Sequence, residues 1–145
     1  MEIISTSTKE TKDFAHEIAT SLRGGETILL YGELGAGKTT FTNFLVNELG
    51  FLDRVQSPTF VLHRVYKKSS ESREIKEVHH FDLYRLTTQE EFDDIGISEL
   101  LHDRNKVVII EWPDRFIESF SKPIIEIKFD TISENERKIN VQNLY

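Results

Sequence analysis

One segment limits the possible folds of this chain more than any other. The run from Gly32 to Thr39 reads GELGAGKT, which matches the pattern glycine, four residues, glycine, lysine, then serine or threonine. A short apolar run (27–31) comes directly before it, and 40–49 has apolar residues at helical spacing. Glycines let a loop curve around a phosphate, and the start of a helix adds unpaired N–H groups. The segment therefore predicts a Walker A phosphate-binding loop, or P-loop, between a buried strand and a helix.

Apolar strands and helices alternate along the rest of the chain. Ser7 and Glu10 have the spacing of a helix capping box, and apolar residues recur every fourth position from Phe14 to Leu22. Short helices are expected after Thr88 and over 97–101, and strands over 59–66, 75–81, 106–111, 123–129 and 138–141. The pattern predicts an α/β fold, a single P-loop NTPase domain over 1–145, with a central, mostly parallel sheet flanked by helices and antiparallel hairpin additions. The charged stretch 67–74 is expected to be the solvated tip of one hairpin.

Composition and charge exclude several classes of protein. The chain has 145 residues, no cysteine, and 18 Lys plus Arg against 25 Asp plus Glu. The net charge of −7 repels a phosphate backbone, so we expect any RNA or DNA to be held by another protein. The absence of cysteine excludes disulfides and suits a reducing cytoplasm. No window resembles the ~20 apolar residues of a membrane span, and the first residues lack the pattern of a secretory signal. We expect a cytoplasmic protein with no membrane contact.

The P-loop motif also assigns chemistry to single residues. Lys38 supplies a compact cation for the β- and γ-phosphates, and the hydroxyl of Thr39 is a ligand for Mg²⁺. A P-loop needs a carboxylate at the end of a neighbouring strand, because Mg²⁺ prefers oxygen ligands. Two acids compete: Glu111 ends an apolar run, and Asp82 ends a less apolar one. Both are expected to face the nucleotide, one near Mg²⁺ and the other holding water, and the residues alone leave the assignment open.

ATP is the expected nucleotide. Proteins that bind GTP through a P-loop usually carry Asn or Thr, Lys, any residue and Asp for the guanine base. Here 105–108 reads NKVV, which lacks the final aspartate, and no other segment supplies the sequence.

Four segments together resemble a known family. GELGAGKTT (32–40), SPTF (57–60), HFDLYRL (80–86) and EWP (111–113) occur in the order and spacing of the bacterial TsaE (YjeE) family, and the resemblance covers nearly the whole chain. This family is the ATPase component of the machinery that makes tRNA threonylcarbamoyladenosine. The resemblance implies a Mg²⁺-dependent ATPase, weak by itself, that docks onto TsaD and TsaB homologues and resets their complex by hydrolysis. Contact with tRNA would be indirect, through that complex.

The resemblance also implies roles for individual residues. Lys38, Asp82 and Glu111 would be catalytic, with Glu111 beside Thr39 at the metal and Asp82 at the nucleotide, where it would orient water. Thr8 falls where family members touch the base or ribose, and 57–59 resembles a switch that responds to the γ-phosphate. Arg137 would lie near the nucleotide, although 135–138 reads NERK where the family often has a Gly-Arg-rich turn. The phosphates would be held by Leu34, Gly35, Ala36, Gly37, Lys38, Thr39 and Thr40.

Two other functions fit the P-loop motif. The first is a small-molecule kinase, although the arginine-rich lid of such kinases has no counterpart in the mixed charges of 67–74. The second is a non-catalytic module whose binding is gated by a nucleotide. Two features stay open. Trp112 either fills the core or shapes the site or the partner surface. His79 and His80 point to opposite faces of a strand, which favours packing or hydrogen bonding over a shared metal.

Overall fold

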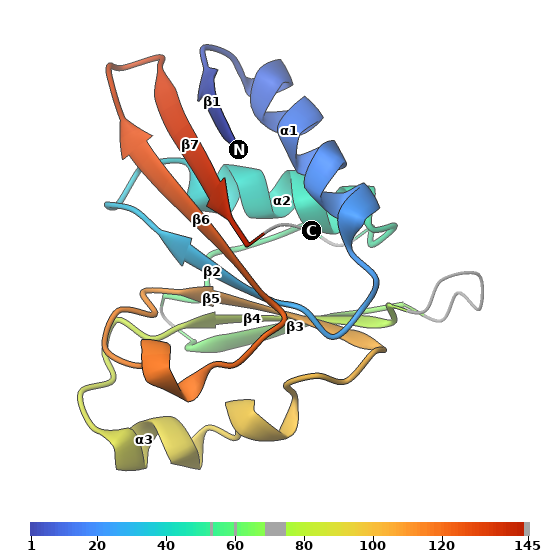
Figure 1. The fold of residues 1–145 in the computed structure, drawn as a ribbon, viewed down its shortest axis with the longest axis vertical. Coiled ribbons are helices and arrows are strands. Elements are labelled where there is room, and N and C mark those ends of the chain that lie inside the picture. Colours follow the sequence, from blue (N-terminus) through green and yellow to red (C-terminus); the bar gives the residue numbers. More distant parts are fainter. Residues whose placement is uncertain (53, 60, 69–74, 144–145) are drawn as a thin grey trace.

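The computed structural model describes residues 1–52, 54–59, 61–68 and 75–143. Seven strands of this described part form a single sheet, with helices on both of its faces (Figure 1). The elements in chain order are β1 (Glu2–Ser5), α1 (Thr8–Ser21), β2 (Thr27–Tyr31), α2 (Lys38–Glu48), β3 (His63–Lys67), β4 (Glu77–Asp82), α3 (Gln89–Asp94), the 3₁₀ turn η1 (Ile97–Glu99), β5 (Lys106–Glu111), the 3₁₀ turn η2 (Ile117–Ser119), β6 (Ile124–Thr131) and β7 (Arg137–Gln142).

The sheet is mixed, which corrects the expectation of a mostly parallel one. Its order is β1-β7-β6-β2-β5-β4-β3. The pairs β6–β2, β2–β5 and β5–β4 are parallel, whereas β1–β7, β7–β6 and β4–β3 are antiparallel. Strands β6 and β7 are too close in sequence for a crossover, and a short connection permits only an antiparallel hairpin. The parallel part is therefore confined to the four central strands, with the two expected hairpins at its sides.

Local signals account for the first helix and for the central strands. The side chain of Ser7 caps α1 by accepting a hydrogen bond from the Glu10 amide, at 3.2 Å. The buried face of α1, which includes Phe14 and Ile18, packs with α2 against one side of the sheet, and α3 covers the other side (Figure 1). Strands β2 and β5 are buried on both faces, so the cores on the two sides share a rigid central pair of strands.

Two segments differ from the sequence-based expectation. Strand β1 was not expected; only Ser5 of its four residues is buried, and antiparallel pairing with β7 holds it in the sheet. The strand expected from residue 59 begins only at His63, because the amides of Val61 and Leu62 both donate to the carbonyl of Pro58 and form a turn. Of the segments named above, Phe60 and 69–74 lie outside the described residues. No helix in the described part is long and apolar enough to cross a membrane.

Candidate nucleotide site

The P-loop connects β2 to α2, as the sequence predicts. Gly35 and Gly37 have φ angles of 81° and 103°, in the left-handed region that favours glycine. At Gly32 a Cβ atom would lie only 2.8 Å from the carbonyl oxygen of Phe129 on β6. The glycines of the motif are therefore required by backbone conformation at the tip of the loop and by a close approach of two strands at its base.

Lys38 begins α2 and folds back over the loop. Its side chain is buried, its Nζ donates to the carbonyl of Gly32, and Nζ lies 4.3 Å from the ring centroid of Trp112. Burial lowers the pKa of Lys38, and the nearby carboxylates of Glu111 and Asp82 oppose that shift. The cation is thus held between the loop backbone, an aromatic face and two acids.

The two candidate acids lie next to each other. Asp82 and Glu111 are register partners at the ends of the parallel strands β4 and β5, and Glu111 is also the partner of Leu30 on β2, just before the P-loop. Both residues are only 4% exposed. The carboxyl ends of neighbouring parallel strands meet at one edge of the sheet, where α/β proteins bind ligands. The structure therefore brings Lys38, Asp82 and Glu111 together, as expected.

Each acid has a hydrogen-bond partner that the sequence did not indicate. The hydroxyl of Thr59 donates to Oδ2 of Asp82 at 2.9 Å, and the Tyr84 amide donates to Oδ1 at 2.9 Å. Nε2 of His80 lies 2.7 Å from Oε2 of Glu111. Side chains alternate between the two faces of a strand, so the sequence of β4 already places His80 on the same face as Asp82. The pairing of His80 with Glu111, 31 positions away, depends on β4 and β5 being neighbours in the sheet.

Trp112 lies at the rim of the site. It directly follows β5, is half-buried, has a φ angle of 56°, and packs against the ring of Tyr84 with centroids 5.0 Å apart. Of the two interpretations of Trp112, the structure favours a residue that shapes the site over one that fills the core.

A cavity of about 230 Å³ joins the P-loop to the start of α1 and to β7. Arg137 reaches this cavity, where its guanidinium donates to the carbonyl of Gly35 at 3.4 Å and to three carbonyls of the 133–136 turn. Leu34, by contrast, is 89% exposed and lines neither of the cavities described here. The expected site residues that line the cavity are Thr8, Ala36, Gly37, Thr40 and Arg137.

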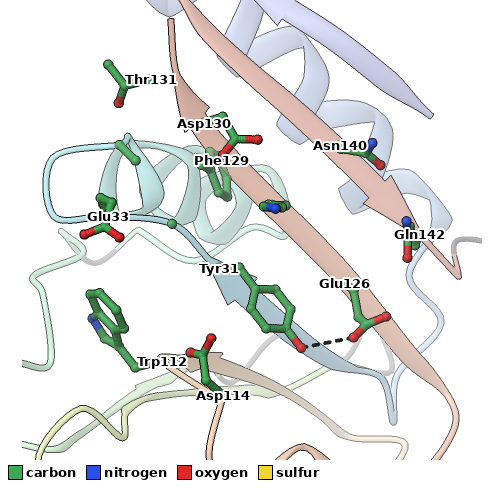
Figure 2. Close-up of a pocket in the computed structure, with 13 residues that line it drawn as sticks. Tyr31, Glu33, Trp112, Asp114, Glu126, Phe129, Asp130, Thr131, Asn140 and Gln142 are labelled. Carbon is green, nitrogen blue, oxygen red and sulfur yellow. Dashed lines mark hydrogen bonds between the residues drawn. The ribbon is translucent and has the colours of Figure 1, made fainter.

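A second cavity, of about 880 Å³, also borders the P-loop (Figure 2). Polar side chains of β6 and β7 form one wall, and Trp112 and Asp114 form another. The hydroxyl of Tyr31 donates to Glu126 at 3.0 Å; burial and this hydrogen bond raise the pKa of Tyr31. No part of the sequence indicated this cavity, because β6 and β7 became neighbours of the P-loop only through the sheet order.

The residues present suit a magnesium ion. The described residues contain no group of three or more His, Cys, Asp or Glu that could enclose a metal by themselves. Thr39 in the first turn of α2 and Glu111 at the end of β5 offer oxygen ligands, and Mg²⁺ commonly takes one or two protein ligands and completes its shell with phosphate and water. This donor set fits magnesium bound together with a nucleotide.

A sheet flanked by helices, with a Walker A loop between its central strand and the following helix, defines a P-loop protein. The family model described as threonylcarbamoyl adenosine biosynthesis protein TsaE matches residues 5–139, so the chain belongs to the TsaE family of tRNA threonylcarbamoyladenosine biosynthesis proteins. The resemblance stated from the four sequence segments is thereby confirmed.

Individual relatives agree with this membership. The tRNA threonylcarbamoyladenosine biosynthesis protein TsaE of Rickettsia felis is 34% identical over 140 residues, which cover 96% of this chain and 78% of the relative. The protein of the same name from Bacillus subtilis is 32% identical over 131 residues, covering 90% and 78%. The crystal structure of Bacillus subtilis YdiB superimposes with a TM-score of 0.77 over the whole chain and 86% of that structure, at 24% identity, and supports the fold.

Proposed function

We propose that this protein is the ATP-binding and ATP-hydrolysing subunit of the complex that makes tRNA threonylcarbamoyladenosine. The observation that carries the proposal is the convergence of Lys38, Asp82 and Glu111 beside the P-loop of a TsaE family member. TsaD and TsaB homologues are the proposed partners, and tRNA is reached only through them, consistent with the net charge of −7. The cytoplasm is the proposed location.

The loop 34–40 would hold the phosphates. Its backbone amides and the start of α2 attract anions, and Lys38 would offset the charge of the β- and γ-phosphates. To do so, its Nζ must exchange the carbonyl of Gly32 for phosphate oxygens. Thr8 and Arg137 would contact the ribose or base from the smaller cavity, which extends from the loop.

Thr39 and Glu111 would hold Mg²⁺, which when bound neutralises phosphate charge in the transition state. Asp82 would orient the water that attacks the γ-phosphate in line with the leaving oxygen. Its carboxylate is already oriented by Thr59 and Tyr84, so the acid is held in place before any substrate arrives. Preorganised groups of this kind lower the barrier because they need no rearrangement in the transition state. Turnover by the isolated subunit is expected to be weak.

The test is to measure phosphate release by the isolated protein and by its mixture with TsaD and TsaB homologues of the same organism. Co-purification with both partners and faster turnover in the mixture are expected. Lys38→Ala should abolish turnover, whereas Lys9→Ala, on the exposed face of α1, should not change it. Equal turnover with and without partners, or failure to associate, would contradict the proposal. Transfer of phosphate to a small-molecule acceptor in preference to water would favour a kinase instead.

A further inference from the structure

The side chain of His80 is fully buried on β4, yet it is not part of the chemistry proposed above. Its Nε2 lies 2.7 Å from Oε2 of Glu111 on the adjacent parallel strand. Its neighbours on the same face of the sheet are the apolar Val78 and Ile109, together with the charged Asp82 and Arg64, its register partner on β3. An aliphatic side chain would pack at this position without burying polar atoms, so the hydrogen bond to Glu111 is what the imidazole adds.

The direction of this hydrogen bond follows from the partners of the two side chains. A carboxylate can only accept, so Nε2 of His80 carries the proton. Nδ1 of His80 is buried and has no hydrogen-bond partner among the described residues. A proton on Nδ1 would bury a donor without an acceptor, whereas an unprotonated Nδ1 leaves only a lone pair unmet. The Nε2–H tautomer therefore fits the site.

The hydrogen bond gives the two carboxylate oxygens of Glu111 different roles. Oε2 accepts from His80, whereas no residue in the described part of the chain donates to Oε1. A carboxylate held at one oxygen keeps its rotamer, and the other oxygen remains available to a ligand. Magnesium demands near-ideal octahedral geometry, so the orientation of its few protein ligands affects its affinity strongly.

We propose that His80 is a positioning residue that orients Glu111 so that Oε1 is presented to Mg²⁺. This inference rests on the proposed function for the presence of a metal–nucleotide complex. His80 itself does not touch the metal or the nucleotide; it acts through Glu111. The sheet supplies the rigidity, because β4 and β5 are paired in register from Glu77–Lys106 to Asp82–Glu111.

The experiment measures how magnesium changes the affinity for ADP, using isothermal titration calorimetry on the isolated full-length protein. His80→Leu removes the donor and keeps an apolar side chain, whereas His80→Gln keeps an N–H donor at a similar reach. In the leucine variant we expect the Mg²⁺ concentration that gives half of the change in ADP affinity to rise by about 10- to 100-fold. This is the usual loss of metal affinity when a residue that hydrogen-bonds to a metal ligand is removed. ADP affinity in EDTA should not change, and the glutamine variant should recover most of the Mg²⁺ response.

His79→Leu is the matched control, because His79 is also buried on β4 but points to the opposite face and contacts His63 and Glu77. It should leave the Mg²⁺ response unchanged. The proposal is overturned if His80→Leu binds Mg²⁺–ADP like the wild type, or if it loses affinity equally with Mg²⁺ and with EDTA, which would indicate a purely structural role.

Nitrogen NMR of the wild-type protein tests the same proposal without a substitution, in case His80→Leu does not fold. The His80 ring should show the Nε2–H tautomer, and its signals should shift when Mg²⁺ is added to the ADP complex. An Nδ1–H tautomer would overturn the proposal. Because these measurements concern binding alone, they can succeed even if the protein proves not to hydrolyse ATP or not to join TsaD and TsaB. A wild type that binds no Mg²⁺–ADP would overturn both proposals.

Discussion

Nζ of Lys38 lies 4.3 Å from the ring centroid of Trp112, so the P-loop lysine and the only tryptophan of the chain are in direct contact. The two residues come from different elements, Lys38 from the start of α2 and Trp112 from the residue after β5. A cation over an indole face contributes about 0.5–2 kcal/mol, depending on how far it is desolvated. Phosphate binding at Lys38, as proposed above, would compete with this contact.

The first prediction is therefore that nucleotide binding changes the fluorescence of Trp112. As Lys38 turns to the phosphates, the charge over the indole moves and the emission should change in intensity and wavelength. Titration with ATP checks this, with Lys38→Ala expected to remove most of the change and Lys9→Ala expected to keep it. Constant emission at nucleotide concentrations that calorimetry shows to be saturating would contradict the prediction.

A second prediction concerns the hydroxyl that holds Asp82. Asp82→Asn should lower the turnover of the partner-activated protein by about 10²-fold or more, while ATP affinity changes little. Thr59→Val removes the donor to Oδ2 but keeps the shape of the side chain, so we expect a smaller loss of turnover. Steady-state phosphate release and separate binding titrations distinguish the two effects. If Thr59→Val reduces turnover as much as Asp82→Asn, the hydroxyl has a role beyond holding the acid.

A third prediction concerns glycine in the P-loop, where Gly37 has a positive φ alone and Gly32 has a positive φ together with a close contact. Gly37→Ala meets open space but keeps φ at 103°, which costs about 1–2 kcal/mol for a non-glycine residue. Gly32→Ala also keeps a positive φ, of 147°, and in addition places an atom 2.8 Å from the carbonyl oxygen of Phe129, so it should lower the free energy of unfolding by more. Urea unfolding of both variants measures the difference. Equal losses would mean that β2 and β6 move apart at no cost.

A fourth prediction concerns stability against pH. Burial, with smaller contributions from His79 and His80, lowers the pKa of His63 from 6.5 to about 4. The unfolded chain then binds more protons than the folded one in this range, so the free energy of unfolding should fall as the pH is lowered from 6.5 towards 4. His63 stacks on Phe81 with centroids 3.9 Å apart, so His63→Phe keeps an aromatic ring and removes the titrating group. Denaturant unfolding across this range should show that the free energy of unfolding depends less on pH in the variant than in the wild type. An identical pH dependence would mean that other groups cause it.

Sequence reasoning succeeded wherever a few neighbouring residues decide the structure. The cap of α1, the P-loop and strand β5 were all predicted, because each is set by contacts or by burial within one short segment. Sequence reasoning failed where contacts between distant segments determine the structure. Strand β1 has only one buried residue and exists through pairing with β7, and the turn at 59–62 interrupts a run with strand composition.

By itself the sequence determined that the chain has a P-loop, which residues could carry its chemistry, and which family it resembles. Only the tertiary structure decided how these residues meet: Asp82 beside Glu111, His80 on Glu111, and Arg137 on the carbonyl of Gly35, 102 positions away. The physical reason is that capping and glycine conformations are local properties of the chain. The order of strands, in contrast, depends on the burial of the whole sheet, to which every strand contributes at once.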